Sequence, residues 1–259
     1  MDKTEDKKDG HSEGAKEQVV LSEDQRASVT SLIKDIFAQN SLGSFAAPEY
    51  AAKFENLLHM LISENEKYNL TAITEPADII LRHFADSLTC SGYIPSGAVT
   101  ADVGCGAGFP CLPLCIVRSD ICMTAIDSTG KKLAFVKAAA DALDVKLSIH
   151  EGRAEQASEL RERFDCVCAR AVAPLPALCE LCLPLVRVGG RFIAMKGASA
   201  SDELRAAANA IKILGARVSS FDEFTLSDAG KRGIIVAEKI SNTPAKYPRM
   251  WAKIKKDPL

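Results

Sequence analysis

The sequence has no excess of positive charge, no long apolar run and only one tryptophan. Its 32 lysines and arginines are balanced by 34 aspartates and glutamates, for a formal net charge of −2. A protein that coats nucleic acid needs a broad basic surface, so any nucleic-acid contact of this chain must use a local patch. Charges and prolines interrupt the apolar stretches well before the roughly 20 residues that a membrane span needs, and no membrane contact is predicted.

The nine cysteines and four histidines form no regular disulfide or metal-binding pattern. The cysteines lie mostly inside apolar stretches, and the opening residues MDKTEDKKDG contain no hydrophobic signal segment. These features predict reduced, small core residues in a cytoplasmic protein. Only Cys179 and Cys182 have a metal-binding spacing, and no second pair at zinc spacing accompanies them. The sequence therefore predicts no metal site.

Composition and hydrophobic period divide the chain into four parts. Residues 1–20 are charged and almost without apolar side chains, so we expect a disordered tail. Residues 21–95 have helical periodicity and form an N-terminal extension, residues 96–242 are the main domain, and residues 243–259 are a basic C-terminal tail. The helices of the extension are expected at about 22–40, 48–68 and 76–88.

In the main domain, strand-like and helix-like segments alternate. The strands are expected at 98–104, 122–127, 145–150, 164–169, 190–196, 216–226 and 232–239. The helices are expected at 109–118, 130–142, 174–186 and 202–214. This alternation predicts an α/β fold with a mostly parallel seven-stranded sheet, helices on both faces and ligands at the carboxyl ends of the strands. The last two strands have little helix between them, which predicts an antiparallel hairpin at the sheet edge.

A glycine-rich turn, TADVGCGAGFPCLP over residues 100–113, follows the first predicted strand. Its glycines, Gly104, Gly106 and Gly108, are spaced G-x-G-x-G, and Phe109 stands where a dinucleotide fingerprint has its last glycine. Asp102 lies two residues before the first glycine, where a negative charge would oppose a pyrophosphate. A carboxylate there suits a ligand with an ammonium group, and S-adenosylmethionine has one and lacks phosphate.

The second predicted strand ends in Asp127, 23 residues beyond Gly104. An acid about 20 residues after such glycines accepts hydrogen bonds from both ribose hydroxyls, in either cofactor class. Asp127 therefore indicates an adenosine group without choosing between S-adenosylmethionine and a nicotinamide dinucleotide.

Seven motifs together resemble the RsmG (GidB) family, the bacterial guanine-N7 methyltransferases of 16S ribosomal RNA. The resemblance covers roughly residues 50–240 and implies a Rossmann-like S-adenosylmethionine-dependent methyltransferase domain over residues 96–242. It also implies 16S rRNA or the small ribosomal subunit as partner. The motifs are YNLTAI (68–73), RHFADSL (82–88), DVGCGAGFP (102–110), DSTGKKLAFV (127–136), GRAE (152–155), ARAVAPL (169–175) and MKG (195–197).

The resemblance also implies roles for particular residues. Gly104 and Phe109 would line the cofactor pocket, and Asp127 with Ser128 would hold the ribose. Ala154 and Glu155 would flank the adenine, and Arg170 would lie beside the cofactor and the target base.

Guanine N7 carries a lone pair and no proton, so its methylation needs positioning and electrostatic stabilisation but no general base. After the fourth predicted strand there is neither the D/N-P-P-Y run of amino-group methyltransferases nor a proline-cysteine pair for attack on pyrimidine C5. Cys168 is expected to be a buried strand residue. No catalytic residue is assigned with certainty, and Arg170 is the candidate for positioning the base and the cofactor.

Several basic residues are candidates for RNA contact, because arginine forms planar bidentate bonds to phosphate and to the guanine edge. We expect the N-terminal helices to cover the first turn of the sheet, with basic side chains around the exposed guanine. The tail 246–256 contains five basic residues with Tyr247 and Trp251, which either neutralise phosphate and stack on bases or form a charged, disordered tail. The candidate residues are Arg82, His83, Lys131, Arg153, Arg170 and Lys196.

Three other functions remain open from the sequence. The first is an S-adenosylmethionine-dependent methyltransferase of another RNA atom or of a small molecule, favoured by the acidic pI of about 6.1. The second is a nicotinamide oxidoreductase, favoured only by the glycine turn and Asp127. The third is a non-catalytic ribosome-assembly factor, against which the intact Asp102, Gly104, Asp127 and Arg170 argue. A monomer is expected in each case.

Overall fold

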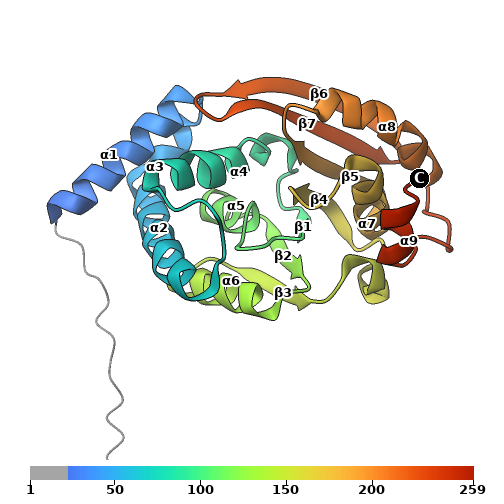
Figure 1. Ribbon diagram of the computed structural model, residues 1–259, viewed down its shortest axis with the longest axis horizontal. Helices are drawn as coiled ribbons and strands as arrows, with labels where there is room; N and C mark the ends of the chain where they lie inside the picture. Colours follow the sequence, from blue (N-terminus) through green and yellow to red (C-terminus); the bar gives the residue numbers. More distant parts are fainter. Residues whose placement is uncertain (1–22) are drawn as a thin grey trace, which may run out of the picture.

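A computed structural model describes residues 23–259, so the tail predicted over residues 1–20 lies outside the described residues. The centre of the molecule is one seven-stranded sheet in the order β3-β2-β1-β4-β5-β7-β6 (Figure 1). The strands are β1 (Val99–Val103), β2 (Cys122–Asp127), β3 (Leu147–Glu151), β4 (Phe164–Arg170), β5 (Val186–Lys196), β6 (Ala216–Leu226) and β7 (Gly230–Lys239).

The sheet confirms the predicted mostly parallel Rossmann-like fold. Strands β1 to β5 pair in parallel, whereas β7 is antiparallel to β5 and β6 is antiparallel to β7. The predicted hairpin is therefore present, and its second strand lies inside the sheet while β6 forms the edge. The strand order reverses between β1 and β4, which is where parallel sheets of this kind bind ligands.

Helices cover both faces of the sheet and form two hydrophobic clusters. On one face α5 (Cys111–Val117) and α6 (Gly130–Ala142) pack with the N-terminal helices. On the other face lie α7 (Leu175–Cys182), α8 (Ala200–Ile213) and the C-terminal α9 (Trp251–Lys256). Consecutive residues of β1 point to opposite faces, so Ala101 and Val103 pack in the second cluster whereas Asp102 points toward α5.

The N-terminal helices reach the glycine turn through a chain of aromatic contacts. The ring of Phe54 lies 5.3 Å from that of Phe37 and 5.4 Å from that of Phe84, and Phe84 lies 6.0 Å from Phe109 in the turn. The chain between α3 and α4 forms a π-helical turn, an irregularity often found at functional sites. The elements are α1 (Glu23–Gln39), α2 (Pro48–Tyr68), α3 (Pro76–Ile79), the π-helical turn (Ile80–Ala85) and α4 (Asp86–Leu88).

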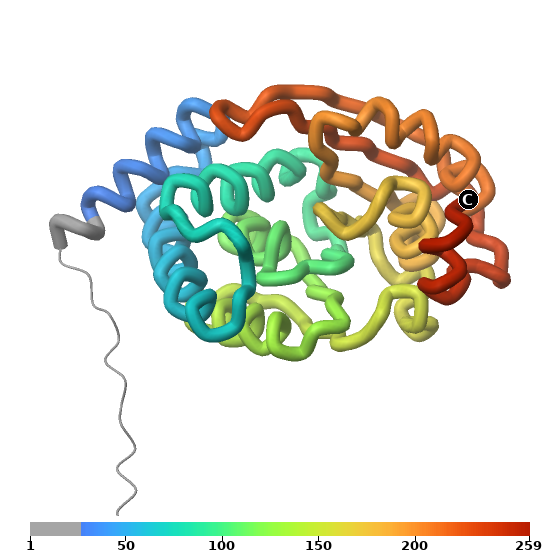
Figure 2. The backbone as a smooth tube through the Cα atoms, viewed as in Figure 1, coloured from blue at the N-terminus to red at the C-terminus, as the bar shows by residue number. Residues whose placement is uncertain are grey.

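The hairpin of β6 and β7 also reaches the N-terminal helices. Figure 2 follows it from the C-terminal half of the chain to the end of α1, where the Ser227 amide donates a hydrogen bond to Asn40 Oδ1 at 2.9 Å. The Arg82 guanidinium donates to the carbonyl oxygen of Asp228 at 3.2 Å. The N-terminal helices thus contact both the glycine turn and the hairpin.

Residues 243–259 pack against α7, although the sequence left a solvated, disordered tail as an alternative. Tyr247 and Ile254 are buried in the second cluster. The Tyr247 ring is therefore not available to stack on RNA bases, which was the other alternative. Arg249 holds this segment in place, because its guanidinium and its amide all donate to the fully buried Glu180 carboxylate, at 2.7 to 3.2 Å. The division of the chain into four domains stays a prediction.

Replacing Arg249 with alanine is expected to lower the free energy of unfolding by about 2 kcal/mol. The Glu180 carboxylate would then be buried with no charged partner, and such a loss costs several kcal/mol in a dry site but less where the arginine is one-fifth exposed. Urea unfolding measures the change. The matched control is the Arg249→Ala, Glu180→Gln double variant, which should recover part of the lost stability. An equal loss in the single and the double variant would contradict the idea that the unpaired Glu180 charge causes the loss.

Candidate functional site

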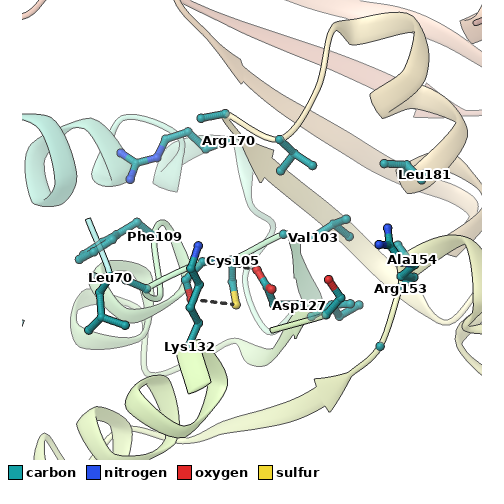
Figure 3. A pocket seen from close by; sticks show the side chains of 18 of the residues that line it. Leu70, Val103, Cys105, Phe109, Asp127, Lys132, Arg153, Ala154, Arg170 and Leu181 are labelled. Carbon is teal, nitrogen blue, oxygen red and sulfur yellow. Dashed lines mark hydrogen bonds between the residues drawn. The ribbon is translucent and has the colours of Figure 1, made fainter. Parts of the chain in front are cut away.

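A cavity of about 420 Å³ opens at the carboxyl ends of β1, β2 and β4. Figure 3 shows Leu70 and Phe109 at one end of it, Ala154 and Leu181 at the other, and Asp127 between the two ends. The volume is within the range of small-molecule sites, and the lining combines apolar walls with a few charged groups. The remaining lining residues are Thr71, His83, Val103, Gly104, Cys105, Gly106, Ala107, Ile126, Ser128, Lys132, Gly152, Arg153, Glu155, Arg170, Ala171, Val172 and Trp251.

The glycine turn forms the floor of the cavity, but its first amides are already occupied. The N–H groups of Gly104 and Cys105 donate to the Ile126 carbonyl oxygen at 2.8 and 3.2 Å. The Gly106 amide donates to Asp127 Oδ2 at 2.9 Å. These amides therefore cannot form the phosphate cradle of a dinucleotide site, and the turn suits a ligand without phosphate.

Two of the glycines serve different purposes. At Gly104, where φ is +70°, a Cβ atom would lie 2.6 Å from Val172 Cγ2, so a larger residue would clash with the loop after β4. At Gly106, where φ is +57°, a Cβ would meet no described atom within 4 Å. Gly104 thus allows close packing inside the protein, whereas Gly106 adopts a left-handed conformation and leaves open space at the cavity.

Asp127 connects the turn to the segment after β2. Its Oδ2 accepts from the Gly106 amide and its Oδ1 accepts from the Thr129 amide at 2.8 Å. Each carboxylate oxygen has further acceptor capacity, because a carboxylate can accept about four hydrogen bonds. The Asp127 carboxylate is thus held at the middle of the cavity, beside Ser128, and can accept further hydrogen bonds.

Asp102 and Gly108 were predicted to bind the cofactor, and neither lines the cavity. Asp102 is completely buried, and its Oδ2 accepts from the Cys111 amide at 2.9 Å. Burial raises the pKa of Asp102 to about 7. In the structure Asp102 thus holds the start of α5, and direct contact of Asp102 and Gly108 with a cofactor stays a prediction.

Glu155 has an unused acceptor at the Ala154 end of the cavity. Its side chain is only 4% exposed, and Oε1 has no hydrogen-bond partner within residues 23–259. The nearest cation is Arg153, whose Nη1 lies 4.0 Å away and whose own side chain is half-exposed. A buried acceptor without a donor is costly, so this carboxylate suits a ligand that donates an N–H group.

At the other end, Arg170 joins β4 to the N-terminal helices. Its Nη1 donates to the Arg82 carbonyl oxygen at 2.9 Å and to Asp86 Oδ2 at 3.0 Å. Its guanidinium carbon lies 5.7 Å from the centre of the Phe109 ring. Asp86 is buried and also accepts from Arg232 Nε at 2.9 Å, so one carboxylate orients two arginines. Arg170 is fixed by these contacts with 12% of its side chain exposed.

His83 packs against the same cluster as a neutral ring. It stacks on Phe109 with ring centres 4.5 Å apart and planes 9° apart, and its Nε2 lies 2.8 Å from Thr71 Oγ1. Burial, with a smaller effect of Arg170, lowers the pKa of His83 to about 3. The ring is therefore uncharged at neutral pH and lines the cavity as a flat wall.

This pKa predicts how His83 affects stability as the pH changes. The unfolded histidine takes up a proton near pH 6.5 and the folded one only near pH 3, so its contribution is complete above pH 6.5 and is lost as the pH falls. Between pH 7 and pH 5 the stability advantage of the natural protein over His83→Gln should shrink by about 2 kcal/mol. Urea unfolding of both proteins at the two pH values tests this. The opposite effect of Asp102 cancels in the difference, and a constant difference would contradict the shift.

A second cavity of about 600 Å³ adjoins the first and shares four of its lining residues, His83, Arg170, Ala171 and Val172. The wall between the two cavities is thus one histidine, one arginine and the start of the loop after β4. The other residues of the second cavity are Ile73, Arg82, Asp86, Ala173, Pro174, Met195, Lys196, Gly197, Glu203 and Arg232.

The predicted RNA-contact residues are distributed unevenly around the two cavities. Lys196 is 7% exposed, donates to the Ala173 carbonyl oxygen at 2.7 Å and pairs with Glu203 at 2.8 Å, so it shapes the second cavity. Lys131 lines neither cavity, and its Nζ lies 6.0 Å from the centre of the Tyr68 ring. Sequence reasoning missed Thr71, Asp86, Lys132, Glu203 and Arg232, although Asp86 stands inside the RHFADSL motif.

Eight of the nine cysteines are buried, and all nine are free thiols. Burial raises the pKa of Cys168 well above its ordinary value, so this thiol is not a nucleophile near Arg170. Among residues 23–259, no three histidine, cysteine or acidic side chains gather as metal ligands do. None of the described helices combines the length and apolar character that a membrane crossing needs.

Comparisons with known proteins agree with this geometry. The family model GidB, rRNA small subunit methyltransferase G, matches residues 50–233. A relative named ribosomal RNA small subunit methyltransferase G, from Deinococcus radiodurans, is 46% identical over 217 residues, which cover 81% of this chain and 85% of the relative. The Bacillus subtilis protein of that name is 42% identical over 224 residues, covering 84% and 94%.

One solved structure is similar in fold. It is a chain from the complex of the Haloferax volcanii Trm112 methyltransferase activator with a methyltransferase. The TM-score is 0.53 at 13% identity, and the match covers 70% of this chain and 98% of that chain.

Proposed function

The chain belongs to the GidB family of small-subunit ribosomal RNA methyltransferases, and on this basis we propose how its two cavities act. It is an S-adenosylmethionine-dependent methyltransferase, and its substrate is 16S rRNA of the small ribosomal subunit. In our proposal the first cavity binds the cofactor and the second receives the guanine whose N7 is methylated. The observation that carries this proposal is the shared wall of His83, Arg170, Ala171 and Val172.

The residues of the first cavity fit an adenosine-containing ligand without phosphate. Asp127 and Ser128 hold the ribose, since the Asp127 carboxylate is fixed by two amides and keeps free lone pairs. Ala154 and Glu155 flank the adenine, whose amino group supplies the donor that Glu155 Oε1 lacks. Gly104, Gly106 and Phe109 line the remaining part of the cavity. When bound, S-adenosylmethionine supplies an electrophilic methyl group on its sulfonium.

The second cavity holds the target base by position and charge. Guanine N7 has a free lone pair and no proton to lose, so the neutral His83 is not needed as a base. Arg170 lies at the boundary of both cavities and keeps the base in line with the methyl group. Asp86 holds Arg170 and Arg232 by ion pairs, and the ion pair of Lys196 with Glu203 forms another part of the lining.

The proposed contacts with the RNA backbone are assigned to basic side chains that are exposed to solvent. Arg153 lines the first cavity with half of its side chain exposed and can reach a phosphate in solvent, and Lys131 lies exposed at the start of α6. His83, Arg170 and Lys196 surround the base itself. We further propose that the protein acts as a monomer, in the cytoplasm and without a metal.

Methyl transfer from labelled S-adenosylmethionine to small ribosomal subunits and to naked 16S rRNA, both lacking this modification, tests the proposal. Label mapped to a single guanine N7 is the expected result. Bound S-adenosylhomocysteine without label in either RNA would redirect the search to other substrates. Efficient methylation of free guanosine would contradict recognition of a structured RNA, and nicotinamide binding without S-adenosylhomocysteine binding would indicate an oxidoreductase.

A further inference from the structure

Trp251, the single tryptophan of the chain, lines the first cavity. In the sequence it lies outside the segment that the family model matches. Trp251 is the first residue of α9, whereas the matched residues end at 233. Helix α9 contacts α7, which contributes Leu181 to the cavity, and α7 contacts the 3₁₀ turn that begins at Ala154. Trp251 also packs on the hydrophobic cluster that contains Leu181 and Ala154. The indole therefore lies at the Ala154 end of the cavity.

Several contacts fix the segment that carries Trp251. Arg161 donates to the carbonyl oxygens of Tyr247, at 2.8 Å, and of Thr243. Arg249, two residues before Trp251, is held by the buried Glu180 of α7. Ile254, one turn after Trp251, is fully buried. Contacts made by residues before and after Trp251 thus fix the position of its indole, as is required of a side chain that forms one wall of a binding site.

We propose that Trp251 is the aromatic wall of the adenine subsite, so that the C-terminal segment closes the adenine end of the cofactor cavity. This inference rests on the proposed cofactor site. Apolar groups of Ala154 and Leu181 form the same end of the cavity, and Glu155 Oε1, which has no hydrogen-bond donor among residues 23–259, adds an acceptor for the amino group of a flat heteroaromatic ring. An indole offers such a ring a stacking surface, and base–aromatic stacking is substantial in protein sites. The sequence alone left two alternatives for this tryptophan, stacking on RNA bases or a place in a charged, disordered tail.

Because Trp251 is the only tryptophan, the fluorescence of the natural, full-length protein tests the proposal directly. Addition of S-adenosylhomocysteine should change the tryptophan emission in a saturable way, and adenosine alone should do the same at higher concentration. Methionine alone should leave the emission unchanged. Binding without any change in emission would overturn the proposal.

Calorimetric titration of variants with S-adenosylhomocysteine supplies the second measurement. We expect Trp251→Ala to bind roughly 10- to 30-fold more weakly and Trp251→Phe within about threefold of the natural protein. Met250→Ala is the matched control, because Met250 is the adjacent residue, is 59% exposed and does not line the cavity. Thermal unfolding of each variant checks that α9 remains packed.

The outcomes separate this inference from the function on which it rests. If the natural protein binds S-adenosylhomocysteine but Trp251→Ala binds equally well, only the adenine wall is wrong. If the natural protein does not bind S-adenosylhomocysteine at all, the cofactor site and the adenine wall both fail. If the emission changes only when a 16S rRNA fragment is added, Trp251 stacks on RNA, and the inference is overturned.

Discussion

Arg170→Ala is expected to lower the rate of methyl transfer to small ribosomal subunits by roughly 100-fold or more. The guanidinium lies at the boundary of the two cavities and is held by Asp86, the Arg82 carbonyl oxygen and the Phe109 ring. Its removal leaves the target base without a fixed partner, and misplacement by about 1 Å can cost two orders of magnitude in rate. Single-turnover transfer of labelled methyl groups measures the effect.

The same variant should keep most of its affinity for S-adenosylhomocysteine, because the proposed ribose contacts lie at the end of β2 and the proposed adenine contacts lie in the 3₁₀ turn that begins at Ala154. Its fold should also survive, since Asp86 keeps Arg232 as a charged partner. Arg170→Lys is the matched control: it retains the charge but loses the planar fork and should recover little activity. Near-normal transfer by Arg170→Ala would remove this residue from the site.

Asp127→Ala is expected to weaken S-adenosylhomocysteine binding by roughly 100-fold or more. The carboxylate orders the glycine turn through the Gly106 amide and the next segment through the Thr129 amide, and in our proposal it also accepts from the ribose. Hydrogen bonds to a charged group contribute about 1.5–3 kcal/mol each, so the loss of even one bond to the ligand has a large effect. Isothermal titration calorimetry measures the affinity.

Two milder variants separate the ribose contact from the order of the turn. Asp127→Asn keeps one oxygen acceptor and should lie between the natural protein and the alanine variant. Ser128→Ala removes a neighbouring hydroxyl and leaves both amide contacts intact, so it should lose less than tenfold. Binding of S-adenosylhomocysteine by Asp127→Ala within threefold of the natural protein would contradict the proposed ribose site.

The structure departs from the sequence-based expectations mainly at the ends of elements. The helix predicted over 174–186 ends at Cys182, because a 3₁₀ turn containing Pro184 follows it. Strand β5 starts at Val186, four residues before the predicted strand, and its first part contains Gly189 and Gly190, which weaken a strand pattern. The third predicted helix contains the π-helical turn, which has no periodic signature of its own.

The sequence by itself determined the succession of strands and helices along the chain, the glycine turn, and the position of Asp127 at the end of β2. These features depend on local periodicity and short spacings, which one stretch of chain expresses without its neighbours. The seven motifs likewise identified the family, because they occur in order along the chain.

Only the tertiary structure decided which groups meet at the site. Asp86 receives Arg170 from 84 residues away and Arg232 from 146 residues away, and no spacing in the sequence relates them. Asp102 lies two residues before Gly104, and only packing shows that it is fully buried, bonded to the Cys111 amide and absent from the cavity lining. Trp251 was assigned to a basic tail, and the buried Arg249–Glu180 pair brings it to the first cavity instead. Such contacts depend on how elements that are distant in the sequence pack together in the interior. They are therefore fixed only when the whole chain is folded.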